Sequence, residues 1–277
     1  YCLALVCLSA LGAGAIGALS AGSDTEFHLA WAWSVGGDAV GSRGLEIVDL
    51  DADGRAEILV AANLEQPDGH WYVLEHRENA LEQIYSSLPR ADGIAGVGSG
   101  AEGGLVRIVV AGSTSLSVYD GPTRRELASF PTLSADNVAL AVGDVDADGI
   151  LDAVLCDAND LYVYELLFGT VRTKFGFGCG HLAIGQTDAD AQLEIALTGN
   201  PSGGFVLDGV SLTVDWADVR GFGFRVCLGD FDADGRDEIA SIVSFSGIRV
   251  QDPESGDLLW EYSPGSVGVL AAADFDD

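Results

Sequence analysis

The sequence predicts an all-β protein, a β-propeller built from four-stranded blades. Two observations lead to this prediction: an acidic nine-residue motif recurs along the chain, and the same succession of short apolar segments surrounds each copy. Copies begin at residues 49, 99, 144, 186, 230 and 274, so successive copies are 42–50 residues apart. Four short strands in a repeat of about 40–50 residues are typical of a propeller blade. We therefore expect about five blades and the start of a sixth, from a full ring of about seven or eight.

The expected strands are short apolar segments bounded by Gly, Pro, Asn or Asp, and no window after residue 19 keeps a helical period. In each repeat the first strand precedes the acidic motif, the second follows it, and the third alternates. The first strands are 45–48, 138–142, 225–228 and 267–272; the second are 57–62, 152–156, 194–197 and 238–243; the third are 71–74, 116–119, 161–164, 205–207 and 248–250. Each fourth strand carries an aromatic side chain that we expect to pack between blades: Tyr85, Phe130, Phe175, Trp216 and Trp260.

Residues 27–35 resemble a fourth strand such as 258–263 but have no inner strands before them. We expect this segment to complete the last blade of the ring. Such closure would cover edge strands that otherwise invite aggregation.

The charge excludes several classes of function. The 277 residues include 13 Lys and Arg but 43 Asp and Glu, which gives a net charge of −30. A nucleic-acid-binding protein needs a basic face, and so does a protein that docks on an anionic membrane. The hydrophobic content of 48% is too high for a disordered acidic tail. This large negative net charge favours a soluble monomer.

The N-terminal segment predicts export. Residues 2–19 carry no charge, and Ala18 and Ser20 provide small residues at the −3 and −1 positions of a cleavage site. We expect residues 1–21 to be a signal peptide with a truncated start and 22–277 to be the mature propeller, without membrane insertion. The alternative is a transmembrane anchor, which the many Gly and Ala residues disfavour. Either reading gives a secreted, extracellular or periplasmic location.

Three cysteines remain after the expected signal peptide: Cys156, Cys179 and Cys227. They form no CxxC pair, so neither a disulfide framework nor a zinc site is indicated. Each lies in or beside an apolar run, which favours a buried small hydrophobic residue. One disulfide is possible, and the sequence does not assign it.

The acidic motif has the residues of a calcium loop. Asp at positions 1, 3 and 5 turns three carboxylates toward one centre, Gly at position 6 permits a positive φ, position 7 offers a carbonyl, and position 9 adds a carboxylate. Such an all-oxygen shell suits Ca²⁺, whereas zinc would need His or Cys. A solvated turn is the plain alternative, but three complete copies disfavour it because four crowded anions repel one another without a cation.

A helix-loop-helix calcium hand is disfavoured. It requires a bidentate Glu at position 12 of the loop. That position holds Val60, Leu155 and Ser241 in the three complete copies, and the flanking segments have a β pattern.

The repeats resemble the FG-GAP/VCBS family, whose calcium loops are shared with the propeller of integrin α-subunits. The resemblance covers residues 27–277 and implies a loop that joins two strands of a blade and holds a mainly structural Ca²⁺. It assigns three ligand sets: Asp49, Asp51, Asp53, Arg55 (carbonyl) and Glu57; Asp144, Asp146, Asp148, Ile150 (carbonyl) and Asp152; Asp230, Asp232, Asp234, Arg236 (carbonyl) and Glu238. Clear Phe-Gly and Gly-Ala-Pro signatures are lacking, so integrins are the more distant relatives.

Two copies depart from the motif. The copy at 186–194 has Gln186 at position 1 and Ala191 at position 6, so Asp188, Asp190 and Glu194 form a weaker site. The copy at 99–107 has lost its acids and is expected to bind nothing. Residues 252–260 resemble the outer hairpin of quinoprotein propellers, Asp-x-x-x-Gly-x-x-x-Trp.

The sequence contains none of the common catalytic motifs, which favours a binding function without settling whether the protein is an enzyme. The first reading is a secreted binding, adhesion or scaffold module for an extracellular protein or carbohydrate. The alternative is the propeller of a secreted polysaccharide-active enzyme resembling lyases, which would need Lys174, Arg172 or His181 to converge at one mouth of the channel. A quinone-dependent dehydrogenase would need a Trp-floored slot with basic contacts, and neither is evident.

Overall fold

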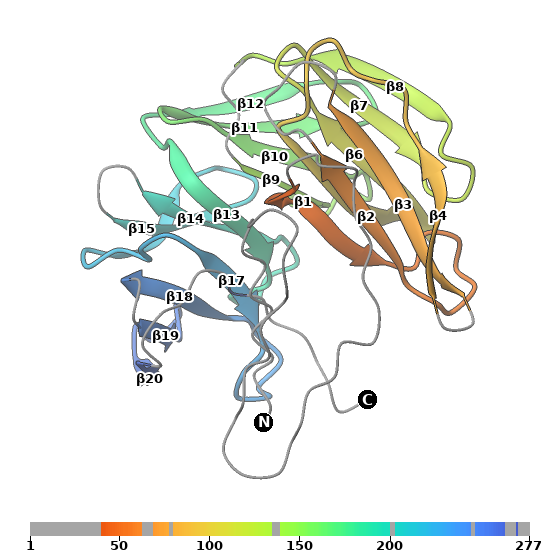
Figure 1. Cartoon of the computed structure of the whole chain (residues 1–277). Helices are drawn as coiled ribbons and strands as arrows, with labels where there is room; N and C mark the ends of the chain where they lie inside the picture. The colour runs from red at the N-terminus through yellow and green to blue at the C-terminus, as the bar shows by residue number, and fades with distance from the viewer. Residues whose placement is uncertain are drawn as a thin grey trace, which may run out of the picture.

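A computed structural model describes residues 40–62, 69–77, 80–134, 139–199, 203–244, 247–263 and 270. In these residues the chain forms five four-stranded antiparallel sheets and no helix, so the fold is an all-β propeller with five blades (Figure 1). The predicted architecture is confirmed for this part. The expected start of a sixth blade, the closing segment 27–35 and the segment 2–19 lie outside the described residues.

Each blade is a meander of four strands that follow one another in the sequence. Blade 1 holds β1 (Val40–Val48), β2 (Glu57–Ala62), β3 (His70–Arg77) and β4 (Ala80–Ser86). Blade 2 holds β5 (Gly96–Glu102), β6 (Leu105–Ala111), β7 (Ser115–Asp120) and β8 (Glu126–Pro131). Blade 3 holds β9 (Ala139–Gly143), β10 (Asp152–Cys156), β11 (Asp160–Glu165) and β12 (Val171–Phe175). Blade 4 holds β13 (Cys179–Gly185), β14 (Glu194–Gly199), β15 (Gly204–Asp208) and β16 (Val214–Asp218). Blade 5 holds β17 (Val226–Gly229), β18 (Glu238–Ser244), β19 (Gly247–Gln251) and β20 (Leu258–Tyr262).

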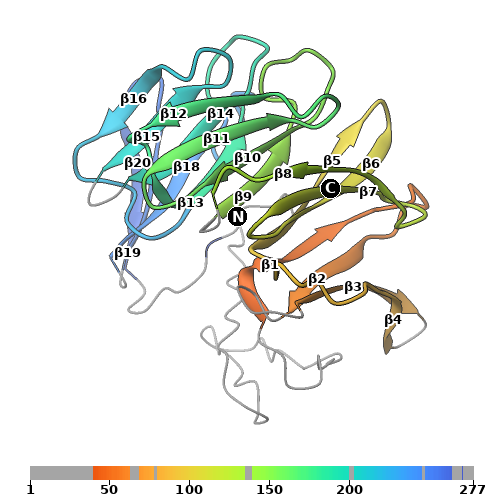
Figure 2. The same cartoon turned by 90° about the horizontal axis from the view of Figure 1, so that it is seen from above.

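The blades are arranged around their first strands. β1, β5, β9, β13 and β17 contact one another in this order, and the other strands of each blade extend outward (Figure 2). All first strands run in the same sense, so the loops that join first and second strands lie at one end of the propeller. The acidic motifs occupy these loops in blades 1, 3, 4 and 5.

The hydrophobic core lies between neighbouring blades. Leu59 and Trp71 of blade 1 pack with Ile108 of blade 2, and all three side chains are fully buried. Similar clusters join blades 2 and 3, 3 and 4, and 4 and 5. The second strands are covered on both faces, which explains their nearly continuous apolar sequence.

Three aromatic residues of the fourth strands, Tyr85, Phe130 and Trp216, pack on the clusters between neighbouring blades as expected, and Trp260 packs on the core of blade 5. The rings of Tyr85 and Trp71 lie 4.6 Å apart, and those of Trp216 and Phe222 lie 5.7 Å apart. The expectation is wrong for Phe175, which is 76% exposed. This residue pairs with Asp160 at the far end of β12, away from the inter-blade core.

Two cysteines differ from the favoured interpretation. Cys156 at the end of β10 and Cys179 at the start of β13 form a disulfide, with Cα atoms 5.8 Å apart. Their apolar surroundings gave no sign of this pairing, because the two residues meet only when blades 3 and 4 pack together. Cys227 is a free thiol, and burial raises its pKa to about 12.

No helix of the described segments has the length and apolar character needed to cross a membrane.

Candidate metal centre

The three complete acidic loops share one backbone conformation. The Ala at position 4 has a positive φ in each loop, 59° at Ala52, 56° at Ala147 and 64° at Ala233. The Gly at position 6 also has a positive φ, between 86° and 93°. A positive φ is costly for Ala, so the loop sequence accepts strain at position 4 and uses Gly where φ is larger. This turn folds the carboxylates at positions 1, 3 and 5 back on one another.

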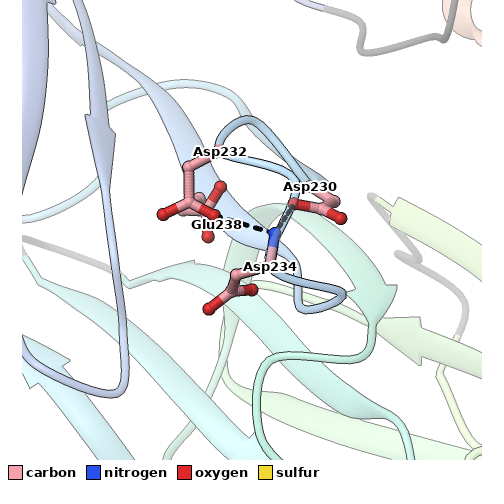
Figure 3. A group of neighbouring side chains, drawn as sticks. All are labelled: Asp230, Asp232, Asp234 and Glu238. Carbon is pink, nitrogen blue, oxygen red and sulfur yellow. Dashed lines mark hydrogen bonds between the residues drawn. The ribbon is translucent and has the colours of Figure 1, made fainter.

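Hydrogen bonds inside each loop hold the carboxylates in place. The Asp at position 1 accepts the amide N–H groups of positions 5 and 6, and the Asp at position 5 accepts the N–H of position 7. In the third loop, at 230–238, Asp234 N lies 3.1 Å from Asp230 Oδ1 (Figure 3). Gly235 N lies 3.0 Å from Asp230 Oδ2, and Arg236 N lies 2.9 Å from Asp234 Oδ1. The loops at 49–57 and 144–152 repeat the pattern with distances of 2.8–3.2 Å.

The acid at position 9 is the buried member of each set. Glu57, Asp152 and Glu238 are at most 3% exposed, and each accepts the N–H of position 2. Burial, with a smaller contribution from the neighbouring loop carboxylates, raises the pKa of Asp152 and of Glu238 to about 7. A buried anion beside other anions is unfavourable, so these sites are built for a cation or a proton.

Several predicted ligands gather closely enough to share one ion. Ligand oxygens lie within 4.8 Å of one another in four groups: Asp49, Asp51 and Asp53; Asp144, Asp146 and Asp152; Asp188, Asp190 and Glu194; Asp230, Asp232, Asp234 and Glu238. Glu57 and Asp148 belong to their loops but fall outside these groups. The groups can hold a metal ion, and their donors are all oxygen atoms.

The loop at 186–194 is built differently. None of its residues has a positive φ, and the Gln186 side-chain amide donates to the Asp190 carbonyl in place of a position-1 carboxylate. Glu194 is 1% exposed; its Oε2 accepts the Thr187 N–H at 2.7 Å, while its buried Oε1 has no hydrogen-bond partner. Burial raises the pKa of Glu194 to about 7. This loop therefore keeps the buried acid but lacks the turn that closes the shell.

The copy at 99–107 is not a loop. β5 and β6 pair continuously up to Glu102 and Leu105, and Gly103 and Gly104 form a two-residue turn with φ of 56° and 80°. Two consecutive residues with positive φ are typical of a tight hairpin turn. The lost acids and the two glycines thus convert the site into a plain β-hairpin.

Neighbouring loops are joined by hydrogen bonds across the blade boundaries. Gln186 N donates to Asp237 Oδ2 at 2.8 Å, and Asp237 N donates to Gln186 O at 2.6 Å. Leu193 N donates to Val145 O at 3.2 Å. The loops of blades 3, 4 and 5 therefore form a connected belt at one end of the propeller.

A cavity of about 320 Å³ lies among the first strands of blades 1 to 4. Its polar lining residues are Glu46, Ser99 and His181, and the Ser99 hydroxyl donates to Glu46 Oε1 at 2.5 Å. Burial raises the pKa of Glu46 to about 7. His181 Nδ1 accepts the Val226 N–H at 3.5 Å.

The basic residues considered for catalysis do not converge. Arg172 and Lys174 lie on the outermost strand β12, whereas His181 lies on the innermost strand β13. Lys174 Nζ lies 5.0 Å from the centre of the Phe177 ring. The sequence did not predict Glu46 as a cavity residue or the contacts of Arg172 with the second complete loop, at 144–152. Only the register between strands brings these residues to their sites, and the motif contains no sign of it.

Comparison with known proteins supports the fold and nothing narrower. No family model and no curated protein matches the chain. Many solved structures do, including BBS1N in complex with ARL6DN soaked with lead, with 12% identity and a TM-score of 0.60 over 83% of this chain and 71% of that chain. The Neurospora crassa Pan2 WD40 domain matches with 13% identity and a TM-score of 0.59 over 82% of this chain and 66% of that one. The V. cholerae biofilm matrix protein Bap1 matches with 16% identity and a TM-score of 0.56 over 87% of this chain and only 43% of its own. At these identities the similarity establishes a β-propeller fold.

Proposed function

We propose that the protein is a secreted, calcium-binding β-propeller that acts as a binding, adhesion or scaffold module. The observation that carries the metal part is the repetition of one loop geometry at residues 49–57, 144–152 and 230–238. Each loop has the same positive φ angles, the same carboxylate hydrogen bonds and a buried acid at position 9. Because the same unfavourable crowding of anions recurs, a common cation is the simplest physical reason for it.

Calcium fits the donors better than other metals. Each set offers only carboxylate and carbonyl oxygens, which suits the high and irregular coordination number of Ca²⁺. Magnesium needs a stricter octahedron and keeps more water, and zinc prefers His or Cys. The resemblance to FG-GAP/VCBS repeats supports the same assignment.

A location outside the cytoplasm agrees with two independent features. Residues 1–21 have the composition of a signal peptide, and the Cys156–Cys179 disulfide is of a kind that persists in oxidising compartments. Free Ca²⁺ is also plentiful outside cells, so loops of modest affinity would be filled there.

A binding function is favoured over a lyase-like enzyme. The enzyme would need the basic residues considered for catalysis to converge at one mouth of the channel, but Arg172 and Lys174 lie on the outermost strand β12 and His181 lies on the innermost strand β13. The ligand of the proposed module is an extracellular protein or carbohydrate that contacts loops at one end of a seven- or eight-bladed ring, the size we propose.

Calorimetric titration with Ca²⁺, combined with elemental analysis of the dialysed protein, tests the metal assignment. Asp51→Asn and Asp232→Asn should each abolish or weaken one site by tenfold or more, by about the effect of removing one charged ligand. Glu261→Gln on the exposed face of β20 is the matched control and should change nothing. Protein that holds no calcium at millimolar Ca²⁺ would refute the proposal.

A further inference from the structure

Arg172 contacts the carboxylates of the second acidic loop. Its Nη2 lies 3.3 Å from Asp146 Oδ2 and 3.7 Å from Asp152 Oδ2, and both acids belong to the group of possible ligands in that loop. Across residues 40–62, 69–77, 80–134, 139–199, 203–244 and 247–263, no other Lys or Arg forms an ion pair with an acid of the four loops. Arg236, which belongs to the third loop, pairs with Glu254 outside the motif.

The same guanidinium also binds the next blade. Arg172 Nη1 donates to the carbonyls of Gly209 and Val210 at 2.6 and 2.8 Å, and these residues form the turn between β15 and β16. Gly209 is required there, because a Cβ would lie 2.2 Å from Val145 O in the second loop. Arg172 therefore connects the second loop of blade 3 with the outer hairpin of blade 4.

Strand register shows that the arginine is peculiar to blade 3. Arg172 pairs with Val163, and the residues in the same register position of blades 1, 2, 4 and 5 are Tyr85, Ala128, Trp216 and Trp260. Four blades thus carry an uncharged side chain where blade 3 carries a cation. A cation at this register position lies beside the acidic loop of its own blade, as Arg172 lies beside Asp146 and Asp152.

We propose that Arg172 is a built-in counter-ion of the loop at 144–152, which makes this loop the weakest calcium site of the three complete loops. A fixed positive charge beside two ligands repels an incoming Ca²⁺ and competes for the same oxygens. The junction of blades 3 and 4 then holds without metal, through Arg172 and the Cys156–Cys179 disulfide. This inference rests on the proposed function, because it concerns the calcium loops themselves.

The test is Ca²⁺ titration of the full chain and of Arg172→Gln, with bound ions counted after dialysis at several free Ca²⁺ concentrations. Wild type should show one complete loop at least about tenfold weaker than the other two, and Arg172→Gln should tighten that site by about tenfold or more. Adding Asp146→Asn to Arg172→Gln should remove the tightened site and so assign it to this loop. Arg77→Gln is the control, because it removes an arginine that pairs with Glu75 and Glu82, outside all four acidic loops.

Arg172→Tyr guards against a folding defect, since Tyr is the residue at the same register position in blade 1. It should keep the inter-blade packing and tighten the second loop as Arg172→Gln does. Equal affinities at all three loops in wild type, or unchanged affinity in both Arg172 variants, would overturn the role of Arg172 and leave the proposed function intact. Absence of bound calcium in every variant would overturn both.

Discussion

The acid at position 9 is the residue on which each loop depends. Glu238 is 3% exposed, and its pKa is raised from 4.5 to about 7, chiefly by burial. A carboxyl group with a raised folded-state pKa favours folding fully below its unfolded pKa, and this stability is lost as pH rises through the folded pKa. Metal-free protein should therefore become less stable between about pH 4.5 and pH 7, because ionised Glu238 is buried without a cation.

Chemical denaturation in chelator across this pH range measures the effect. Glu238 alone should cost about 3 kcal/mol, and Glu238→Gln should flatten the profile by that amount. Glu261→Gln, an exposed carboxyl group in the same blade, should leave the slope unchanged. In excess Ca²⁺ the ionised form is the one that binds, so the trend should reverse. A pH-independent stability in chelator would contradict the buried-acid account.

The Gly at position 6 is needed for its backbone angle alone. Gly235 has a φ of 93°, and no atom lies within 4 Å of the place where a Cβ would be. Gly235→Ala should therefore destabilise the protein by about 1 kcal/mol without any steric clash. Gly247→Ala, at a glycine with no positive φ and room for a methyl group, is the control. Equal effects of the two changes on the unfolding midpoint would exclude a role for the loop turn.

Individual residues were predictable where the motif repeats. In the loop at 230–238 all four carboxylates gather as the sequence predicts, because a short loop brings its own residues together, whereas Glu57 and Asp148 fall outside the groups of their loops. The contact of Arg172 with the loop at 144–152 could not be predicted, because Arg172 belongs to another strand and only the pairing of β12 with β11 brings it there. The Gln186–Asp237 contact was hidden for the same reason, as it crosses a blade boundary.

At the scale of the elements, the disulfide joins blades 3 and 4 in addition to their apolar packing and the hydrogen bonds between them. It closes a 23-residue separation between Cys156 and Cys179. Replacing both cysteines with alanine should lower the free energy of unfolding by about 2–4 kcal/mol. Cys227→Ala should keep the disulfide, which peptide mapping by mass spectrometry can identify. Finding only reduced Cys156 and Cys179 in protein exported to an oxidising compartment would contradict this prediction.

Blades 4 and 5 are joined instead by a buried polar network. Arg249 on β19 is 3% exposed; it donates to Asp218 Oδ2 at 3.2 Å and to Gly221 O at 2.9 Å, while Gln251 Nε2 donates to the same Asp218 oxygen at 2.9 Å. Arg249→Met removes the buried cation that faces the Asp218 carboxylate, and it should lower the free energy of unfolding by about 3 kcal/mol or more.

The exposed pair of Arg77 and Glu75 provides the contrast for this network. Arg77 is 52% exposed, so Arg77→Met should change stability by less than about 0.5 kcal/mol. Denaturation midpoints of the two variants compare buried and exposed pairing directly. Similar effects would show that the network at Asp218 does not support the blade junction.

Strand positions were predicted closely because each strand pattern recurs at the blade spacing. The second strands 57–62 and 152–156 agree with β2 and β10. The copy at 99–107 is located in the sequence by the apolar strand that follows it, which does not define the conformation of the copy itself. Its backbone follows Gly103 and Gly104, which favour a tight hairpin.

At the scale of the whole molecule, ion binding at the acidic loops would reduce the repulsion caused by the negative net charge. The net charge of −30 makes the chain repel itself, and each bound Ca²⁺ would remove two units of that charge at the end of the propeller where the loops meet. Monovalent salt should stabilise metal-free protein more than calcium-loaded protein, because salt screens the repulsion between carboxylates that bound Ca²⁺ would otherwise neutralise. Thermal unfolding in a salt series, with chelator or with Ca²⁺, measures the difference. Equal salt effects in both states would contradict an electrostatic role for the ions.

Calcium-dependent thermal unfolding of the full chain tests the central claim most directly. Each site filled at 100 times its dissociation constant stabilises the folded state by about 2.7 kcal/mol. At about 2–4 °C per kcal/mol, two filled sites should raise the melting temperature by about 10 °C or more relative to chelator. Asp51→Asn combined with Asp232→Asn should remove most of that rise, and Mg²⁺ at equal concentration should reproduce little of it. An unchanged melting temperature with Ca²⁺ would show that the acidic loops are solvated turns and that the propeller stands without metal.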